Sequence, residues 1–108
     1  MQSYKPTYLP DGAELKNTVE QPEMLAYEYA INESGYFNIL LSKSDTRIYA
    51  DAENTEIESF DKGGVIGYYF KKDDLNYICY ERDGDCFSIY GSIDMDELIK
   101  IAAGITTE

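Results

Sequence analysis

The dipeptide Asp83-Gly84 most constrains the fold, because it is the strongest short-range hairpin signal in the chain. Aspartate followed by glycine favours a type I′ turn, whose backbone twist matches that of the strands it joins. Counting outward pairs Tyr80 with Phe87 and Ile78 with Ile89, which gives one apolar face. The other face then carries a second set of side chains, with Tyr77 directly opposite Tyr90: Tyr77, Cys79, Glu81, Cys86, Ser88 and Tyr90.

The same alternation predicts an earlier hairpin with strands over residues 25–31 and 37–41. We expect the loop Glu33-Ser34-Gly35 with a left-handed Gly35, because it places both apolar sets on one face. This loop pairs Ile31 with Phe37, Tyr29 with Ile39 and Tyr27 with Leu41. A two-residue loop is the alternative, and it would turn Phe37 to the opposite face.

Further strands are predicted from the same period, and the segments between them are polar. Residues 65–71 form a third clear strand, whose register through Asp73-Asp74 stays open between two loop lengths. Weaker strands are expected near 13–19 and 55–60, and a polar loop over 44–54. Residues 1–12 are interpreted as an extended lead-in that ends in a turn at Gly12, and residues 105–108 as a frayed tail.

A helix ends the predicted fold. Asp94 is a good N-cap and Glu97 completes a capping box, while Ile93 and Leu98 form a hydrophobic staple. Gly104 stands where a left-handed C-terminal cap belongs. Four residues give the apolar stripe: Met95, Leu98, Ile99 and Ala102.

That stripe must be buried, and the apolar sheet face is the only large partner for it. The 108 residues therefore predict a single α+β domain: an antiparallel meander of about five to seven strands with the helix packed on one face. The lead-in takes residues 1–12, the sheet 13–91 and the helix 93–104.

The charge of the chain excludes several classes of partner. Nine lysines and arginines against 21 carboxylates leave a net charge of −12, which repels nucleic-acid phosphates and anionic lipid. No apolar run approaches the roughly 20 residues of a membrane span, so we expect no membrane insertion by this segment. The chain also lacks histidine, the commonest general base and metal ligand near neutral pH.

The remaining chemistry-bearing residues favour structural interpretations. Cys79 and Cys86 fall diagonally on one face, which favours two free thiols and leaves a disulfide as the alternative. The carboxylates are scattered and match no calcium loop, so they indicate an acidic surface, with weak calcium binding as the alternative. Gly63, Gly64 and Gly67 indicate a turn and a bulge rather than a phosphate loop. We therefore expect no enzyme, no cofactor and no metal.

The eleven tyrosines are the one feature that indicates a function. Tyrosine combines a flat apolar ring with a polar tip, which suits recognition surfaces as well as the rim of a core. If the second face of the last hairpin is uncovered, Tyr77 and Tyr90 with Glu81 and Ser88 form a candidate partner-binding patch.

Two neighbouring segments near the C-terminus form one pattern. The first is residues 77–91, with the sequence Tyr-Ile-Cys-Tyr-Glu-Arg-Asp-Gly-Asp-Cys-Phe-Ser-Ile-Tyr-Gly, and the second is the predicted helix with Asp96-Glu97-Leu98-Ile99-Lys100-Ile101-Ala102. An aromatic strand, an acidic-glycine turn, a second aromatic strand and this type of helix resemble the bacterial family called domain of unknown function 4367. The opening Leu9-Pro10-Asp11-Gly12 is similar to the opening of that family. Tyr80 stands where the family leads us to expect tryptophan.

The resemblance implies an extracytoplasmic tail of a membrane-anchored bacterial protein, with an anchor upstream of Met1; if Met1 is the native start, the domain is cytoplasmic. It carries over no catalytic or ligand-binding residue. A more distant similarity to half-barrel lipoprotein carriers and sigma regulators implies an apolar ligand or a peptide in a concave sheet. We expect a non-enzymatic binding or sensory domain for a protein, peptide or envelope component. The alternative is a structural module that self-associates through a sheet edge.

Overall fold

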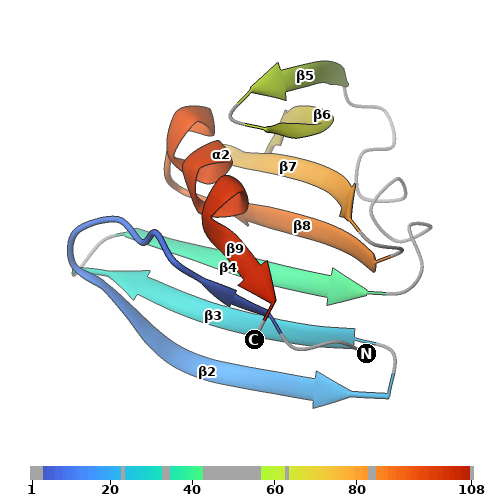
Figure 1. Ribbon diagram of the computed structural model, residues 1–108. Coiled ribbons are helices and arrows are strands. Elements are labelled where there is room, and N and C mark those ends of the chain that lie inside the picture. The colour runs from blue at the N-terminus through green and yellow to red at the C-terminus, as the bar shows by residue number, and fades with distance from the viewer. Residues whose placement is uncertain are drawn as a thin grey trace.

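The structure is a computed structural model that describes residues 4–22, 24–32, 35–42, 57–62, 64–82 and 85–107. Its centre is a seven-stranded antiparallel sheet with the order β2-β3-β4-β8-β7-β6-β5 (Figure 1). The strands are β2 (Ala13–Gln21), β3 (Met24–Ile31), β4 (Gly35–Ser42), β5 (Glu58–Lys62), β6 (Val65–Lys72), β7 (Leu75–Arg82) and β8 (Asp85–Gly91).

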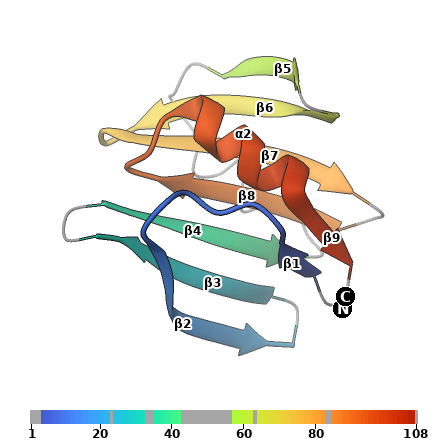
Figure 2. The ribbon, with the colours of Figure 1, turned by 60° about the vertical axis from the view of Figure 1, so that its left-hand side comes forward.

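The second layer lies on one face of this sheet. It consists of the helix α2 (Met95–Gly104) and a two-stranded ribbon of β1 (Tyr4–Pro6) and β9 (Ile105–Thr107) (Figure 2). The predicted α+β class with a C-terminal helix on one sheet face is therefore confirmed. The strand order refines the expected meander, because two meanders, β2-β3-β4 and β5-β6-β7-β8, are joined by the pairing of β4 with β8.

The last hairpin has the predicted register. Tyr80 pairs with Phe87, Ile78 with Ile89 and Tyr77 with Tyr90. The register predicted for the earlier hairpin is wrong by two residues, because Tyr29 pairs with Phe37 and Ile31 with Gly35. Asn32 takes the left-handed backbone with a φ of 54°, which asparagine tolerates well, and Gly35 belongs to β4. A shift of two residues preserves the sheet face, so Tyr29, Phe37 and Ile39 still point into the core.

The open register between β6 and β7 is settled by a two-residue turn. Asp73 and Asp74 have φ values of 53° and 65°, as a type I′ turn requires, and Lys72 pairs with Leu75. Gly64 has a φ of 84°, in keeping with the predicted turn, but the bulge expected with these glycines is wrong at Gly67. The register of Gly67 with Tyr80 on β7 runs without a shift, and the sheet's irregularity lies in β2 between Leu15 and Asn17.

The helix begins as predicted and ends differently. Asp94 is the N-cap, and its Oδ1 accepts a hydrogen bond of 2.9 Å from the backbone N–H of Glu97. The left-handed cap expected at Gly104 is wrong, because Ile105 follows with an extended backbone and continues into β9. The carbonyl of Gly104 instead accepts from the backbone N–H and the hydroxyl of Thr7, at 2.8 and 2.6 Å. A side chain at position 104 would meet the lead-in at 3.0–3.1 Å, so glycine permits this close approach.

The predicted frayed tail is also wrong, because residues 105–107 form β9 and pair with β1. Ile105, the first residue of β9, is buried. The lead-in likewise contains a strand that the sequence pattern did not reveal, since Tyr4–Pro6 is too short to show any period. The two ends of the described chain therefore lie side by side (Figure 2).

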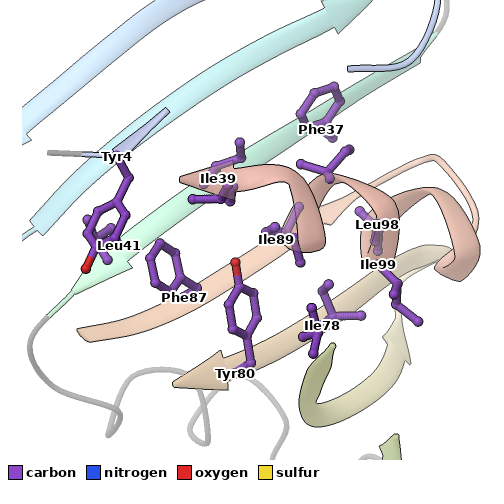
Figure 3. Close-up of a cluster of buried hydrophobic side chains, with 14 of the residues drawn as sticks. Tyr4, Phe37, Ile39, Leu41, Ile78, Tyr80, Phe87, Ile89, Leu98 and Ile99 are labelled. Atoms are coloured by element: carbon purple, nitrogen blue, oxygen red, sulfur yellow. The ribbon is translucent and has the colours of Figure 1, made fainter. Parts of the chain in front are cut away.

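The core lies between the sheet and the second layer (Figure 3). Tyr80 stacks on Phe87 with ring centroids 4.9 Å apart, and Tyr4 meets the edge of the same ring at 5.0 Å. Each fully buried leucine, isoleucine or phenylalanine stabilises the fold by about 1.5–3 kcal/mol. The side chains buried most completely are Phe37, Phe87, Leu41, Ile78, Ile89, Leu98, Ile101 and Ile105.

The polar loop predicted over residues 44–54 and Gly63 lie outside the described residues. Within the part that the structure describes, no helix has both the length and the apolar character needed to cross a bilayer.

Candidate functional site

The site is built on the sheet face opposite α2, here called the outer face. An aromatic row crosses it from β6 to β8 and consists of Phe70, Tyr77 and Tyr90. Tyr77 stacks on Phe70 with centroids 4.6 Å apart and on Tyr90 with centroids 4.9 Å apart, at interplanar angles of 10° and 12°. The row forms because these residues are direct cross-strand partners, and neighbouring strands are about 4.8 Å apart.

The row continues as polar side chains on the other half of the sheet. The Nδ2 of Asn38 donates to the Tyr90 hydroxyl at 3.1 Å, which fixes the polar tip of the last ring. Asn38 pairs with Glu28 on β3, and the Oε1 of Glu28 accepts from Asn17 on β2 at 3.0 Å. One line of cross-strand neighbours thus runs over six strands, from apolar at β6 to polar at β2.

The four residues predicted for the partner-binding patch all lie on the outer face. Tyr77 and Tyr90 are in direct contact and half-buried, and Glu81 is exposed. Ser88 is buried, and its hydroxyl accepts a long hydrogen bond of 3.9 Å from the Cys79 thiol. The patch was predicted on the condition that this face is uncovered. Glu81 is exposed and the two tyrosines are half-exposed, so the face is uncovered at Glu81 and partly uncovered at the tyrosines. The patch stays a prediction.

Two exposed apolar residues on this face were not singled out from the sequence. Ile66 is 71% exposed and Tyr68 is 43% exposed, and both point outward from β6. Their face could not be assigned while the β6–β7 register was open. Treating Asp73-Asp74 as a two-residue turn would have placed Tyr68 opposite Cys79, beside the predicted patch.

The two cysteines are buried and free, as the diagonal register favoured. They form a small second cluster with Phe70, against which Tyr77 packs. Among the described side chains, no group of three cysteine or carboxylate residues is placed to hold a metal ion.

Under the β1–β9 ribbon, the described residues of the sheet face leave little room for a ligand. A hollow remains between the β1–β9 ribbon and strands β3 and β4, and its volume is about 10 Å³. This is about the space of a single water molecule. Several of the chain's own residues pack on this face: Tyr4 and Ile105 from the ribbon, and Leu98, Ile99, Ile101 and Ala102 from the helix.

A larger hollow of about 280 Å³ lies where β6 begins, β7 ends and the last turn of α2 passes. Glu81 is the charged residue of its lining, which consists of Gly64, Val65, Ile66, Tyr80, Glu81, Ala102 and Ala103. Its lining includes Glu81 and Ile66, whose side chains project to the opposite sheet face by strand alternation.

Two tyrosines have perturbed pKa values on the helix side of the sheet. The hydroxyl of Tyr8 donates to Glu97 at 2.7 Å, and this bond raises the pKa of Tyr8, with smaller contributions from burial and nearby carboxylates. Burial raises the pKa of Tyr29, and Tyr27 adds to the effect. In both residues the neutral phenol is favoured over the phenolate.

The fold has solved counterparts. The chain is similar to MucB in the crystal structure of MucB in complex with MucA(peri), with a TM-score of 0.64 and 10% identity over 97% of this chain and 36% of that one. It is also similar to MucB in the Pseudomonas aeruginosa MucA/MucB complex, with a TM-score of 0.56 and 12% identity over 97% of this chain and 35% of that one. The chain thus spans about a third of the length of these MucB chains, and the likeness shows the fold.

No curated protein matches the chain in sequence. A family model does match: that of the domain of unknown function DUF4367, over residues 3–105. The resemblance seen in the aromatic hairpin and the C-terminal helix is confirmed by this match. The chain belongs to the DUF4367 family of domains of unknown function.

Proposed function

We propose that this chain is a non-enzymatic binding or sensory domain that recognises a protein or peptide through its outer face. The observation that carries the proposal is the pair of exposed residues Ile66 and Tyr68 beside the aromatic row. Exposed apolar residues that gather on one face mark interaction surfaces. Tyrosine contributes large contact area at a low cost in conformational entropy.

The geometry favours the outer face over the helix side. Under the β1–β9 ribbon, the described residues leave a hollow of only about 10 Å³ beside β3 and β4, so an apolar ligand has no space of its own size at that place. On the outer face, the bond from Asn38 and the two stacked contacts hold Tyr77 and Tyr90 in place before any partner arrives. Such preorganisation lowers the entropic cost of binding.

The likeness to MucB supports a protein partner, since both solved structures are complexes of MucB with MucA. The same likeness supports a position on the extracytoplasmic side of a membrane-anchored bacterial protein. The absence of histidine from the sequence supports a non-enzymatic role.

Photo-crosslinking in the full-length protein tests the proposal. A benzoyl-phenylalanine at position 59, which pairs with Tyr68 across β5 and β6, is expected to capture one protein in intact envelopes. The substitution Tyr68→Ser should remove that crosslink, because it removes exposed contact area from the outer face.

The matched control is Leu15→Ser, which changes a residue of similar exposure on the edge strand β2. Its crosslink should persist. A crosslink that survives Tyr68→Ser, or that disappears equally in the control, would show that the outer face does not bind the partner.

The second candidate function is self-association through an open sheet edge. It is favoured by β2, a nine-residue strand at the end of the sheet, which pairs with β3 alone among the described strands. Multi-angle light scattering across a wide concentration range decides it. A mass that stays at that of one chain removes this candidate, and a dimer that dissociates in Thr18→Pro supports it.

A further inference from the structure

An exposed isoleucine on the outer face stands between two carboxylates. Ile66 on β6 is 71% exposed, and its cross-strand partner on β5 is Asp61. On the other side of β6, Gly67 pairs with Tyr80. The same register, continued by one residue, sets Glu81 of β7 beside Ile66. Asp61 and Glu81 are exposed, and all three side chains belong to the outer face by strand alternation.

An exposed aromatic ring completes this group of side chains. Tyr68 follows Ile66 by two residues on β6, so it points to the same face about 7 Å further along the strand. Its exposed fraction is 43%. The two carboxylate residues lie on the neighbouring strands, each about 4.8 Å from β6, so their backbones are roughly 10 Å apart. Asp61, Ile66, Tyr68 and Glu81, here called the Ile66 site, therefore surround an area that one long side chain can cover.

The Ile66 site carries negative charge that the described part of the chain does not balance. Among the described side chains, no lysine or arginine forms an ion pair with Asp61 or Glu81. Lys62, the next residue of β5, belongs to the opposite sheet face by strand alternation. Lys72 shares the outer face but ends β6 six residues from Ile66, roughly 20 Å away. The net charge of −12 adds to the negative potential at longer range.

We propose that the Ile66 site binds an arginine side chain of the partner protein. The inference rests on the proposed function and specifies the chemistry of its partner. The aliphatic stem of the arginine would lie on Ile66, which removes that exposed side chain from water. The guanidinium has five N–H donors in a planar fork, so it can donate to both Asp61 and Glu81. The face of the same group can stack on the ring of Tyr68.

Other occupants fit less well. A second copy of the chain, docked through the same surface about a two-fold axis, would bring the carboxylates of both copies together and be repelled. A purely apolar segment would remove Asp61 and Glu81 from water without a counter-charge. A calcium ion takes six to eight oxygen ligands, and the site offers two carboxylates on separate strands. Lysine carries a compact, strongly hydrated charge, whereas the planar guanidinium can meet two carboxylates and stack on a ring.

Nuclear magnetic resonance of the ¹⁵N-labelled chain tests the inference, with Nα-acetyl-arginine amide as the probe. The expected result is concentration-dependent shifts at the amides of Asp61, Ile66, Tyr68 and Glu81. Nα-acetyl-lysine amide, which adds the same charge and ionic strength, should produce smaller shifts, and the uncharged Nα-acetyl-citrulline amide smaller ones still. Equal shifts from the arginine and lysine probes, or shifts spread over other acidic surfaces, would overturn the inference.

Charge-removing substitutions separate the Ile66 site from general charge attraction. Asp61→Asn and Glu81→Gln should each weaken arginine binding by about two- to fivefold, as loss of a surface ion pair does. Glu58→Gln is the matched control, because it removes a charge of the same sign from an exposed position of β5 that faces the helix side. It should leave binding unchanged. Equal effects of Asp61→Asn and Glu58→Gln would contradict the assignment of the site.

The two proposals fail separately. A specific crosslink at position 59 without arginine binding at the Ile66 site would overturn this inference and leave the outer face as a protein-binding surface. Arginine binding without a specific crosslink would overturn the proposed function and leave the Ile66 site as a site for arginine.

Discussion

At the residue scale, the aromatic row combines recognition chemistry with structural support. Tyr77 lies between Phe70 and Tyr90 at stacking distance from both, so its ring stabilises two neighbouring strands. Stacked aromatic pairs contribute about 0.5–1.5 kcal/mol each beyond the burial of area. A variant that removes this ring therefore alters the fold as well as the surface, which is why the binding tests above use the exposed Tyr68.

Substitution of Tyr77 by alanine should lower the free energy of unfolding by about 2–3 kcal/mol, because two ring contacts and part of the burial are lost. Tyr77→Phe keeps the rings and should cost less than about 1 kcal/mol. Urea denaturation followed by circular dichroism measures both. Equal losses in the two variants would contradict the contribution of the stacked row.

A second residue-level prediction concerns alkaline pH. Burial raises the pKa of Tyr29 above the ordinary value near 10, so the unfolded chain loses this proton first as pH rises. The stability that the neutral phenol contributes is complete below about pH 10 and is lost as pH rises towards the folded pKa.

Tyr29→Phe should therefore reduce the fall in the urea midpoint between about pH 8 and pH 11. Tyr36→Phe, at an exposed position of β4, controls for the loss of one phenol. A fall that is identical in Tyr29→Phe and the unchanged chain would contradict the prediction.

At the scale of elements, turns and caps with strong local signals were predictable. The register of the last hairpin was predictable because aspartate followed by glycine favours a two-residue loop, and Asp94 determined the helix start through a single hydrogen bond. The earlier hairpin differed because Asn32 could take the left-handed conformation as well as Gly35. Which of the two residues takes the left-handed conformation depends on how the two connected strands pair.

The β1–β9 ribbon could not be predicted, because its stability comes from contacts between the two ends of the chain. The need for glycine at position 67 was equally hidden from the sequence, because it depends on a residue of the neighbouring strand. A Cβ at Gly67 would lie 2.8 Å from the Cβ of Tyr80 on β7. In the candidate site, the face of Tyr77, Tyr90, Glu81 and Ser88 was predictable from the hairpin. The burial of Ser88 and the hollow beside Glu81 depend on tertiary packing.

The ribbon is held to the sheet by a buried hydrogen bond, which a substitution can test. The hydroxyl of Tyr4 donates to the Oδ2 of Asp85 at 2.9 Å, and both residues are buried. Tyr4→Phe should lower the free energy of unfolding by about 1.5–3 kcal/mol, because a hydrogen bond to a carboxylate is lost away from water. Urea denaturation measures the loss.

The matched control is Tyr8→Phe, which removes a hydroxyl bonded to Glu97 at a more accessible site. Its effect should be smaller, since water can replace the lost bond. A larger loss in Tyr8→Phe than in Tyr4→Phe would show that the ribbon is not anchored through Asp85.

At the scale of the whole molecule, net charge is the dominant electrostatic property. The principal extents are 31, 30 and 25 Å, and the Debye length is about 30 Å at 0.01 M salt but about 3 Å at 1 M. At low salt the excess carboxylates, which give the net charge of −12, therefore repel one another across the entire molecule, while at high salt only adjacent charged groups interact.

The melting temperature should accordingly rise as sodium chloride increases from about 0.01 to 1 M, because screening removes this repulsion from the compact state. Differential scanning calorimetry measures the shift, and chloride is chosen because sulfate stabilises proteins by surface exclusion. A melting temperature that is constant or falls with salt would contradict the prediction.

The pairing of Tyr4 with Thr107 has a mechanical consequence. Tension applied between these two residues acts on one end of the antiparallel ribbon, so its hydrogen bonds break one after another and β1 separates from β9. The same movement draws Tyr4 away from Phe87 and Asp85 and bares the apolar groove over β3 and β4. A small pulling force on the chain ends would thus uncover sheet surface that the relaxed domain keeps hidden.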